Sequence, residues 1–498
     1  MKYIMRTLYI ICFFLLTGGI VGCYEDKGNY TYTELLEIKV DSVKQFYPNY
    51  LSLIDTLYIE PKVGPADLEY DYVWSVYENN VQGFVPPVDT ISRTCELSYP
   101  VTLKPGSYTL LFSVTEKKSG IFRIVRSNLT VGTALTIGWY VLKSQEGYSD
   151  LDVFGEEGKI ENVIAVNNNG VKLKGDAVAT TFSARYSAWD ESSQNYINTS
   201  AVFAASGEGL VSLRLNDGTI IREDNDFFYE PTPIAPTTFY VTIRDVCLFN
   251  NKRAYIISGM SSNSGRFPVS KGGVYELSPY YVSYRMDNLV FDELSSSFKG
   301  LGANSNSIIN LQDKGPVDTI PLPPVNNLES DLLYMGPGPN SSAWALLKKQ
   351  QEEFYVMRNM NGNLSSPYKN PSLRCDTLDL DLKMLHAEKW ASNRNNNIVY
   401  FVRGNIIYSC NLDANYQEKV QMELPVGERV SYMEQVKLNS STKTFDHIVV
   451  ATYDENNYKV YLFNVQAGNL QSNPEVLKGT GKVGDVVYVY NTTSSDMP

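Results

Sequence analysis

The stretch with the most chemical potential joins acidic residues directly to aromatic ones. Asp224 and Asp226 precede Phe227, Phe228 and Tyr229, and prolines follow. Carboxylate oxygens are the ligands that Ca²⁺ takes from proteins, and an aromatic face can stack on a sugar ring. The composition therefore indicates a calcium site or a sugar-binding loop. A solvated, proline-rich loop between two strands is the alternative for the same residues.

A second aromatic group contains Tyr280, Tyr281 and Tyr284. Tyrosine suits a surface that is apolar at one end and wet at the other, because its ring is apolar and its tip is polar. These three side chains could line the mouth of a binding site, or they could pack inside a strand. They join the acidic segment as candidate ligand-binding residues.

Residues for metal-dependent or nucleophilic catalysis are scarce. Only His386 and His447 are present, and no serine–histidine–carboxylate order typical of a triad can be built around them. No CxxC or CxxH spacing occurs, so the usual zinc motifs are missing from the sequence. The sequence thus predicts no catalytic residue, no cofactor and no metal beyond the calcium considered above.

Four cysteines lie beyond the N-terminal region, far apart in the sequence. Isolated cysteines flanked by apolar strand residues are more often buried free thiols than members of a disulfide framework. We therefore expect free thiols at Cys95, Cys247, Cys375 and Cys410.

The chain is long and acidic. Its 498 residues exceed what one small core can serve, which predicts two or three domains or one large repeat body. The formal net charge of −12 argues against nucleic acid as a partner, because phosphate neutralisation dominates that kind of binding.

The N-terminus has the layout of a secretory signal. Lys2 and Arg6 precede an apolar run over residues 8–16, and small residues follow. The sequence Ile-Val-Gly-Cys that ends at Cys23 resembles the lipobox of diacylglyceryl-modified lipoproteins. This likeness implies removal of residues 1–22 and a lipid with palmitate-type acyl chains on Cys23, which is enough for stable anchoring. An ordinary signal peptide with an incidental cysteine is the alternative.

The residues after Cys23 extend this interpretation. Glu25 and Asp26 resemble the export signal of surface lipoproteins in Bacteroidota, which marks passage to the outer face of the outer membrane. We expect residues 23–35 to form a lipid-anchored linker and the mature protein to face the cell exterior. A merely solvated linker is the alternative.

Short strands dominate from residue 36 to residue 132. In the segment 70–76, Tyr72, Trp74 and Val76 share one face of an alternating strand. A Pro-Gly turn at residues 105–106 leads into another alternating strand. A buried Trp and about 100 residues of such strands are typical of an immunoglobulin-like β-sandwich.

At this point the sequence resembles a known family. The segments YDYVWSV at 70–76, LKPGSYTLLFSVTEKKSG at 103–120 and LTIGWYVLKSQEGYSDLDVFG at 135–155 are similar to PKD-like family lipoproteins of Bacteroidota, as is CYEDKGNY at 23–30. The resemblance implies a surface lipoprotein that is often encoded near Sus-type nutrient-import systems. It supplies neither a ligand nor a catalytic residue.

Residues 133–498 read as repeated pairs of apolar, aromatic-bearing strands. The unit returns about every 45–60 residues, which predicts a β-propeller-like domain of six to eight blades. We expect the last strand, Val483–Tyr490, to close the ring near Gly138. Residues 378–391 are the best helix candidate. A second set of sandwich domains is the alternative to the propeller.

These observations favour non-catalytic binding at the cell surface, in support of glycan or peptide capture with a Sus-type outer-membrane transporter. The partnership is implied by the family resemblance alone. A carboxylate-dependent glycan-degrading enzyme is the first alternative, since paired carboxylates about 5–10 Å apart suffice for glycoside hydrolysis. A structural or adhesive surface protein is the second.

Overall fold

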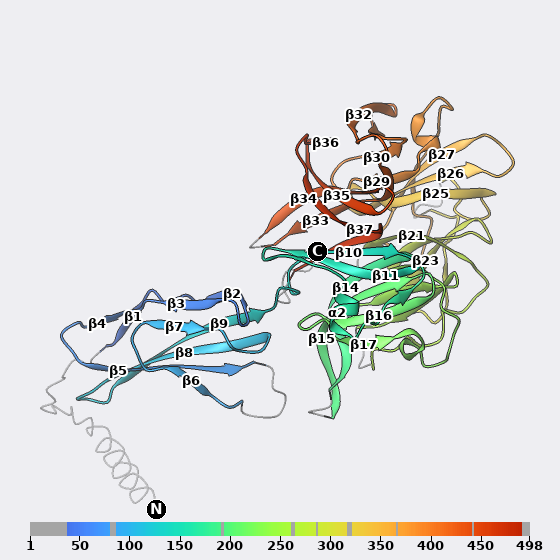
Figure 1. Ribbon diagram of the computed structural model, residues 1–498. Coiled ribbons are helices and arrows are strands. Elements are labelled where there is room, and N and C mark those ends of the chain that lie inside the picture. Colours follow the sequence, from blue (N-terminus) through green and yellow to red (C-terminus); the bar gives the residue numbers. More distant parts are fainter. Residues whose placement is uncertain are drawn as a thin grey trace, which may run out of the picture. The chain divides into compact units, whose positions relative to one another are not determined.

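The computed structural model describes residues 37–79, 86–190, 194–259, 264–284, 287–315, 321–364, 367–440 and 443–490. The signal segment, Cys23 and the linker 23–35 therefore lie outside the described residues. The protein is an all-β protein, with an N-terminal sandwich and a β-propeller-like region (Figure 1). Its contacts divide it into two compact units, of which the larger holds residues 129–498.

The smaller unit is a sandwich built around Trp74. Its main sheet has the order β2-β9-β8-β5-β6, and two strand pairs, β1-β4 and β3-β7, accompany it. The Trp74 indole is fully buried, stacks on Phe112 at 4.2 Å between ring centroids and donates from Nε1 to the carbonyl of Cys95. This confirms the predicted strand face. The strands are β1 (Lys39–Asp41), β2 (Phe46–Leu51), β3 (Thr56–Ile59), β4 (Lys62–Gly64), β5 (Tyr70–Glu78), β6 (Asp89–Ser92), β7 (Leu97–Pro100), β8 (Gly106–Glu116) and β9 (Phe122–Gly132).

Seven antiparallel sheets, here called blades 1 to 7, make up the described part of the larger unit. Blade 1 contains β10 (Gly138–Gln145), β11 (Tyr148–Gly155), β12 (Gly158–Ile160), β13 (Leu173–Lys174) and β38 (Lys482–Val489). Blade 2 contains β14 (Ala177–Asp190), β15 (Asn195–Ser206), β16 (Gly209–Arg214) and β17 (Ile220–Glu223). Blade 3 contains β18 (Pro236–Val241), β19 (Val246–Asn250) and β20 (Arg253–Ile257). Blade 4 contains β21 (Leu277–Tyr284), β22 (Asp287–Asp292), β23 (Ser297–Gly302) and β24 (Ile309–Asn310).

Three further blades complete the set. Blade 5 contains β25 (Ser330–Pro337), β26 (Ser342–Lys349), β27 (Tyr355–Asn361) and β28 (Ser372–Thr377). Blade 6 contains β29 (Lys389–Ser392), β30 (Ile398–Arg403), β31 (Ile406–Asn411) and β32 (Gln417–Glu423). Blade 7 contains β33 (Arg429–Asn439), β34 (Thr444–Tyr453), β35 (Asn457–Gln466), β36 (Asn469–Leu470) and β37 (Glu475–Thr480). The short helical segments are α2 (Val163–Asn167), η1 (Asp224–Phe227), η2 (Pro339–Ser341) and η3 (Lys383–His386).

The blades form a closed ring around an axis. Each first strand contacts the first strand of the next blade, in the order β38, β14, β18, β21, β25, β29, β33 and back to β38. The ring closes because β38, the last described strand, pairs with β10, with Gly138 opposite Val489. This confirms the predicted closing strand. Closure leaves no open sheet edge at the seam between the two ends of the ring.

The apolar runs in the sequence are explained by blades that bury both faces. Along β15, Val202 and Ala204 pack toward blade 1, whereas Phe203 and Ala205 pack toward blade 3. Successive side chains of a strand point to opposite faces, so a strand between two neighbours is apolar at every position. Seven such hydrophobic clusters, each joining two neighbouring blades, are found among the described residues.

The predicted helix over residues 378–391 is wrong. Only the single turn η3 (Lys383–His386) is helical, and β29 begins at Lys389. Lys389 pairs with Val402 of β30, so these residues supply the first strand of blade 6. Pairing with a distant strand overrides the local preference for helix.

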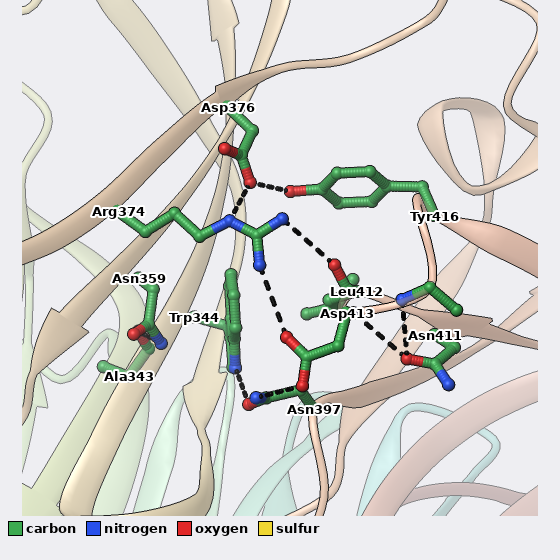
Figure 2. A network of polar contacts seen from close by, with 11 residues as sticks. Ala343, Trp344, Asn359, Arg374, Asp376, Asn397, Asn411, Leu412, Asp413 and Tyr416 are labelled. Carbon is green, nitrogen blue, oxygen red and sulfur yellow. Dashed lines mark hydrogen bonds and ion pairs between the residues drawn. The ribbon is translucent and has the colours of Figure 1, made fainter.

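Ion pairs and hydrogen bonds between blades supplement the apolar clusters. Between blades 5 and 6, Arg374 Nε lies 2.5 Å from Asp376, its Nη1 lies 3.3 Å from Asp413, and Asp376 accepts a hydrogen bond from the Tyr416 hydroxyl (Figure 2). The guanidinium also lies 6.0 Å from the ring of Trp344. The donors and acceptors of this network bond to one another. We therefore interpret the network as a structural contact between blades 5 and 6.

Candidate functional site

The strongest site lies at the axis of the ring. Tyr281 comes from β21, Arg394 follows β29, Tyr432 and Glu434 lie on β33, and Asp485 lies on β38. We call these five residues the axial cluster. Glu434 and Asp485 both act electrostatically on Tyr281, although blade 4 is a neighbour of neither blade 7 nor blade 1. Tyr281 can be near both carboxylates only if the three side chains face one another across the axis.

Hydrogen bonds fix the two carboxylates. The hydroxyl of Tyr432 donates to Glu434 Oε2 at 2.8 Å and lies 3.2 Å from the carbonyl oxygen of Val486. Asp485 Oδ2 accepts from the backbone N–H of Thr180 at 2.7 Å, and Oδ1 accepts from the N–H of Val486 at 2.8 Å. Asp485 therefore ties blade 1 to blade 2, and its orientation is set by the backbone.

The protein around the axis disfavours charge on both carboxyls. Burial raises the pKa of Asp485 to about 8, and the nearby negative charge of Glu434 adds to this effect. Burial likewise raises the pKa of Glu434, while Tyr432 and Arg394 oppose the rise. At neutral pH the pair therefore keeps a proton, which allows it to donate as well as accept a hydrogen bond.

Glu434 is enclosed and yet reached by solvent. Protein surrounds its carboxyl on all sides, but the residue keeps exposed surface. Arg394 is exposed as well. Glu434 and Arg394 therefore remain accessible to solvent at the axis.

Tyr281 presents an uncharged hydroxyl to the same place. Its ring stacks on Tyr240, with 3.7 Å between centroids and 13° between planes. Burial raises the pKa of Tyr281 far above its usual range, and the carboxylates of Glu434 and Asp485 reinforce the effect. The hydroxyl therefore stays protonated. No described residue forms a hydrogen bond with it.

The cluster offers unused donors and acceptors. The described residues leave Glu434 Oε1, the Arg394 guanidinium and the Tyr281 hydroxyl without hydrogen-bond partners. An acceptor and two donors beside an aromatic ring match the edge and face of a hydroxylated ligand such as a sugar. The arrangement can bind such a ligand without any covalent step.

The structure places the acidic-aromatic segment differently from the expectation. Phe227 and Phe228 are buried in the cluster between blades 2 and 3, so neither ring can stack on a ligand. Asp226 forms ion pairs with Arg222 and Arg266. The burial of the two rings and the ion pairing of Asp226 have the same cause, which is that the segment packs inward as the turn η1 at the end of blade 2.

The other two residues of that segment are also engaged. Asp224 Oδ1 accepts from the backbone N–H of Leu210 at 2.9 Å. Tyr229 is the exposed member, and its hydroxyl lies 2.6 Å from Ser264 Oγ. No group of three or more carboxylate, histidine or cysteine side chains that could hold a metal ion occurs in the described residues.

The three tyrosines of the second aromatic group have different surroundings in the structure. Tyr281 joins the axial cluster, as described above. Tyr280 packs edge-on against Tyr334 at 5.5 Å, and the Tyr284 hydroxyl donates to the carbonyl of Gly338 at 2.8 Å. Both of these serve the contact between blades 4 and 5. Within the described residues all four cysteines are free.

Sequence reasoning did not single out Arg394, Tyr432, Glu434 or Asp485. A signal was available, because Glu434 and Asp485 are carboxylates inside the strand segments YMEQV and VGDVV and lie next to apolar residues. Such positions favour a partner or a function over simple solvation. The partners themselves lie on other blades and cannot be read from a local pattern.

Comparison with known proteins adds a family match over part of the chain. Residues 23–177 match the PKD-like family. This span contains all four segments on which the sequence resemblance was based. No curated protein matches the chain. No helix among the described residues is long and apolar enough to cross a membrane.

Several solved structures are similar to the chain at low identity. A quinonprotein alcohol dehydrogenase-like protein from Bacteroides thetaiotaomicron shows 11% identity and a TM-score of 0.40, covering 92% of this chain and 98% of its own. The extracellular domain of a putative one component system from the same organism shows 8% identity and a TM-score of 0.39, covering 90% of this chain and 59% of its own. The WD40 domain of SCAP from fission yeast shows 10% identity and a TM-score of 0.35, covering 62% of this chain and 74% of its own.

Proposed function

We propose that this protein is a cell-surface binding protein whose axial cluster holds a hydroxylated ligand, in the first instance a glycan. The observation that carries the proposal is the set of free hydrogen-bonding groups at the axis, on Glu434, Arg394 and Tyr281. Side chains from blades 1, 4, 6 and 7 meet there, so the complete ring is needed to form the site. Ligand sites with a few converging polar groups are commonly preformed in this way.

The polar groups favour a glycan over an extended peptide. A peptide bound by strand addition is held by main-chain hydrogen bonds at a sheet edge, whereas the free groups of the axial cluster belong to side chains. A sugar needs an acceptor and donors at fixed spacing, together with an apolar face. The axial cluster supplies these from side chains held by the backbone at Asp485 and by stacking at Tyr281.

Binding can be tested by titrating neutral oligosaccharides into the protein and following heat or intrinsic fluorescence. Glu434→Gln and Tyr281→Phe each remove one contact, and we expect each to weaken binding by about tenfold. Tyr229→Phe removes an exposed tyrosine hydroxyl of the acidic-aromatic segment and serves as the matched control. Equal affinities for all four proteins would place the ligand elsewhere.

The surface location follows from the lipobox-like sequence at Cys23 and the acidic residues after it. Cys23→Ala is expected to release the protein from membranes, and a protease added to intact cells is expected to digest the wild-type protein. A co-purification from solubilised outer membranes would test the partnership with a Sus-type transporter. Recovery of the protein alone under mild detergent would argue against that partnership.

A second candidate function is glycan hydrolysis. It is favoured by the pair of carboxyls at the axis, since Asp485 with a pKa of about 8 could act as a general acid beside Glu434. Against it, both oxygens of Asp485 already accept backbone hydrogen bonds. Release of reducing ends that Asp485→Asn abolishes, with binding retained, would establish the enzyme instead.

A further inference from the structure

A group of cations without carboxylate partners lies at one rim of the ring. The first strands of successive blades are related by rotation about the axis, so they all begin on the same side of the ring. Lys389 begins β29, Arg429 begins β33 and Lys482 begins β38. These strands belong to blades 6, 7 and 1, which are consecutive in the closed ring, and β33 contacts both of the others.

Contacts with one aromatic ring bring two of the three cations, Arg429 and Lys482, to the same place. The Arg429 guanidinium lies 5.0 Å from the centroid of the Tyr453 ring, and the Lys482 ammonium lies 5.2 Å from the same centroid. Lys389 begins β29, the strand beside β33, and burial together with the charge of Lys482 lowers its pKa. Like charges held this close repel one another unless an anion lies between them.

The carboxylates next in sequence to Lys389, Arg429 and Tyr453 have other partners. Glu388 accepts from the backbone N–H of Gly404 at 2.9 Å. Glu428 accepts from Thr452 Oγ1 at 2.6 Å and pairs with Lys459. Asp454 accepts from the backbone N–H of Asn457 at 3.0 Å.

The three cations themselves are free. Within the described residues, none of their side chains forms an ion pair or donates a hydrogen bond. All three side chains are exposed, so a ligand can reach them.

We propose that Lys389, Arg429 and Lys482 form an oxyanion-binding site at this rim, one that takes a sulfate, phosphate or carboxylate group of a ligand. Two ammonium groups and a guanidinium supply charge and several N–H donors, which is the chemistry that recognises such groups. The site does not depend on the axial cluster for its formation. This site would bind an anionic group of a ligand, whereas the axial cluster would bind the hydroxyls.

The site lies close to the axis. Lys482 and Asp485 are three residues apart on β38, so they are about 10 Å apart along the strand. One oligosaccharide with an anionic substituent could therefore contact both places. This second step rests on the proposed function, whereas the oxyanion site itself does not.

The test is a calorimetric titration of the full chain with three probes. These are inorganic pyrophosphate, a sulfated dextran oligosaccharide and the unsulfated oligosaccharide of equal length. We expect the sulfated probe to bind and its affinity to fall as salt rises, because the attraction is electrostatic. Binding of pyrophosphate in addition would show that the anionic group alone suffices, whereas binding of the sulfated probe alone would show that the sugar contributes.

Substitutions make the test specific. The triple variant Lys389→Gln, Arg429→Gln, Lys482→Gln is expected to lose at least about tenfold in affinity for the sulfated probe. The control triple Lys172→Gln, Lys478→Gln, Arg123→Gln removes the same charge from exposed positions elsewhere and is expected to keep the affinity. A charge-keeping triple, Lys389→Arg, Arg429→Lys, Lys482→Arg, should bind as the wild type and shows that the site tolerates substitution.

Equal binding by the glutamine triple and the control triple would overturn the proposal, as would equal binding of sulfated and unsulfated probes. Glu434→Gln separates the two sites. That variant is expected to bind the neutral glycan about tenfold more weakly and to bind the oxyanion as the wild type does, so the failure of one proposal would leave the other standing.

Discussion

The hydroxyl of Tyr432 lies 2.8 Å from the carboxylate of Glu434, two positions further along the same strand β33. Residues at i and i+2 of a strand share a face, so this contact is set by local geometry. Its place is unusual, because Glu434 also acts electrostatically on Asp485 of blade 1 and on Tyr281 of blade 4 at the axis. A local pair thereby becomes part of a site built by the whole ring.

Removing this hydroxyl should raise the pKa of Glu434 further. The hydrogen bond from Tyr432 favours the charged carboxylate, and burial opposes it. We expect Tyr432→Phe to shift the Glu434 titration upward, as measured by carboxyl ¹³C NMR. Tyr461→Phe is the matched control, because Tyr461 donates to Glu428 at 2.9 Å away from the axis. That control should move the Glu428 titration and leave Glu434 unchanged.

The raised pKa of Asp485 predicts a direction for stability against pH. The folded protein holds this proton up to about pH 8, whereas an unfolded chain releases it near the ordinary aspartate pKa of 3.8. Between these values the folded state binds more protons, so this group's contribution to stability is present at low pH and is lost as the pH rises toward 8.

We expect Asp485→Asn to remove that dependence. The difference in thermal midpoint between variant and wild type should shift in favour of the variant as the pH rises from 4 to 8. Other carboxyls titrate in both proteins and cancel in this difference. A difference that stays constant across the range would contradict the assignment of the raised pKa to Asp485.

A buried ion pair should be critical to ring closure. Lys143 lies 3.0 Å from Asp152, with 3% and 0% of the two side chains exposed, and Asp152 also accepts from the Tyr458 hydroxyl of blade 7 at 2.7 Å. Asp152→Ala leaves a buried ammonium without its main partner. We expect a loss of about 3–5 kcal/mol in the free energy of unfolding, measured by denaturant titration.

The exposed pair of Lys174 and Glu208 is the control for this measurement. Glu208→Ala should cost less than about 1 kcal/mol, because solvent screens an exposed pair. Similar losses for Asp152→Ala and Glu208→Ala would show that the seam between blades 1 and 7 does not depend on the buried pair.

The sandwich should respond to the loss of its central ring. Trp74 is fully buried and stacks on Phe112, so Trp74→Ala leaves a large cavity. We expect a cost of about 3–5 kcal/mol to the smaller unit. Calorimetry should show an earlier transition for that unit and an unchanged transition for the larger one. A single transition that shifts as a whole would show that the two units unfold together.

The fold could be predicted from the sequence because its signals are local. The run Val202–Ala205 and the run Ile398–Val402 are apolar at every position, which is typical of a strand buried on both faces. The repeat of such pairs predicts a closed array, and a final strand that matches the first blade predicts its closure. Trp74 with its alternating neighbours likewise predicts a sandwich.

The sites depend on tertiary structure for a physical reason. Alternation tells which residues of one strand share a face, but it does not tell which distant strand lies opposite. From the sequence alone, Phe227 and Phe228 are candidates for an exposed platform. The packing of blades 2 and 3 buries them. Glu434 and Asp485 lie on separate strands until ring closure brings them to one axis, where burial raises both pKa values and the charge of Glu434 raises that of Asp485 further.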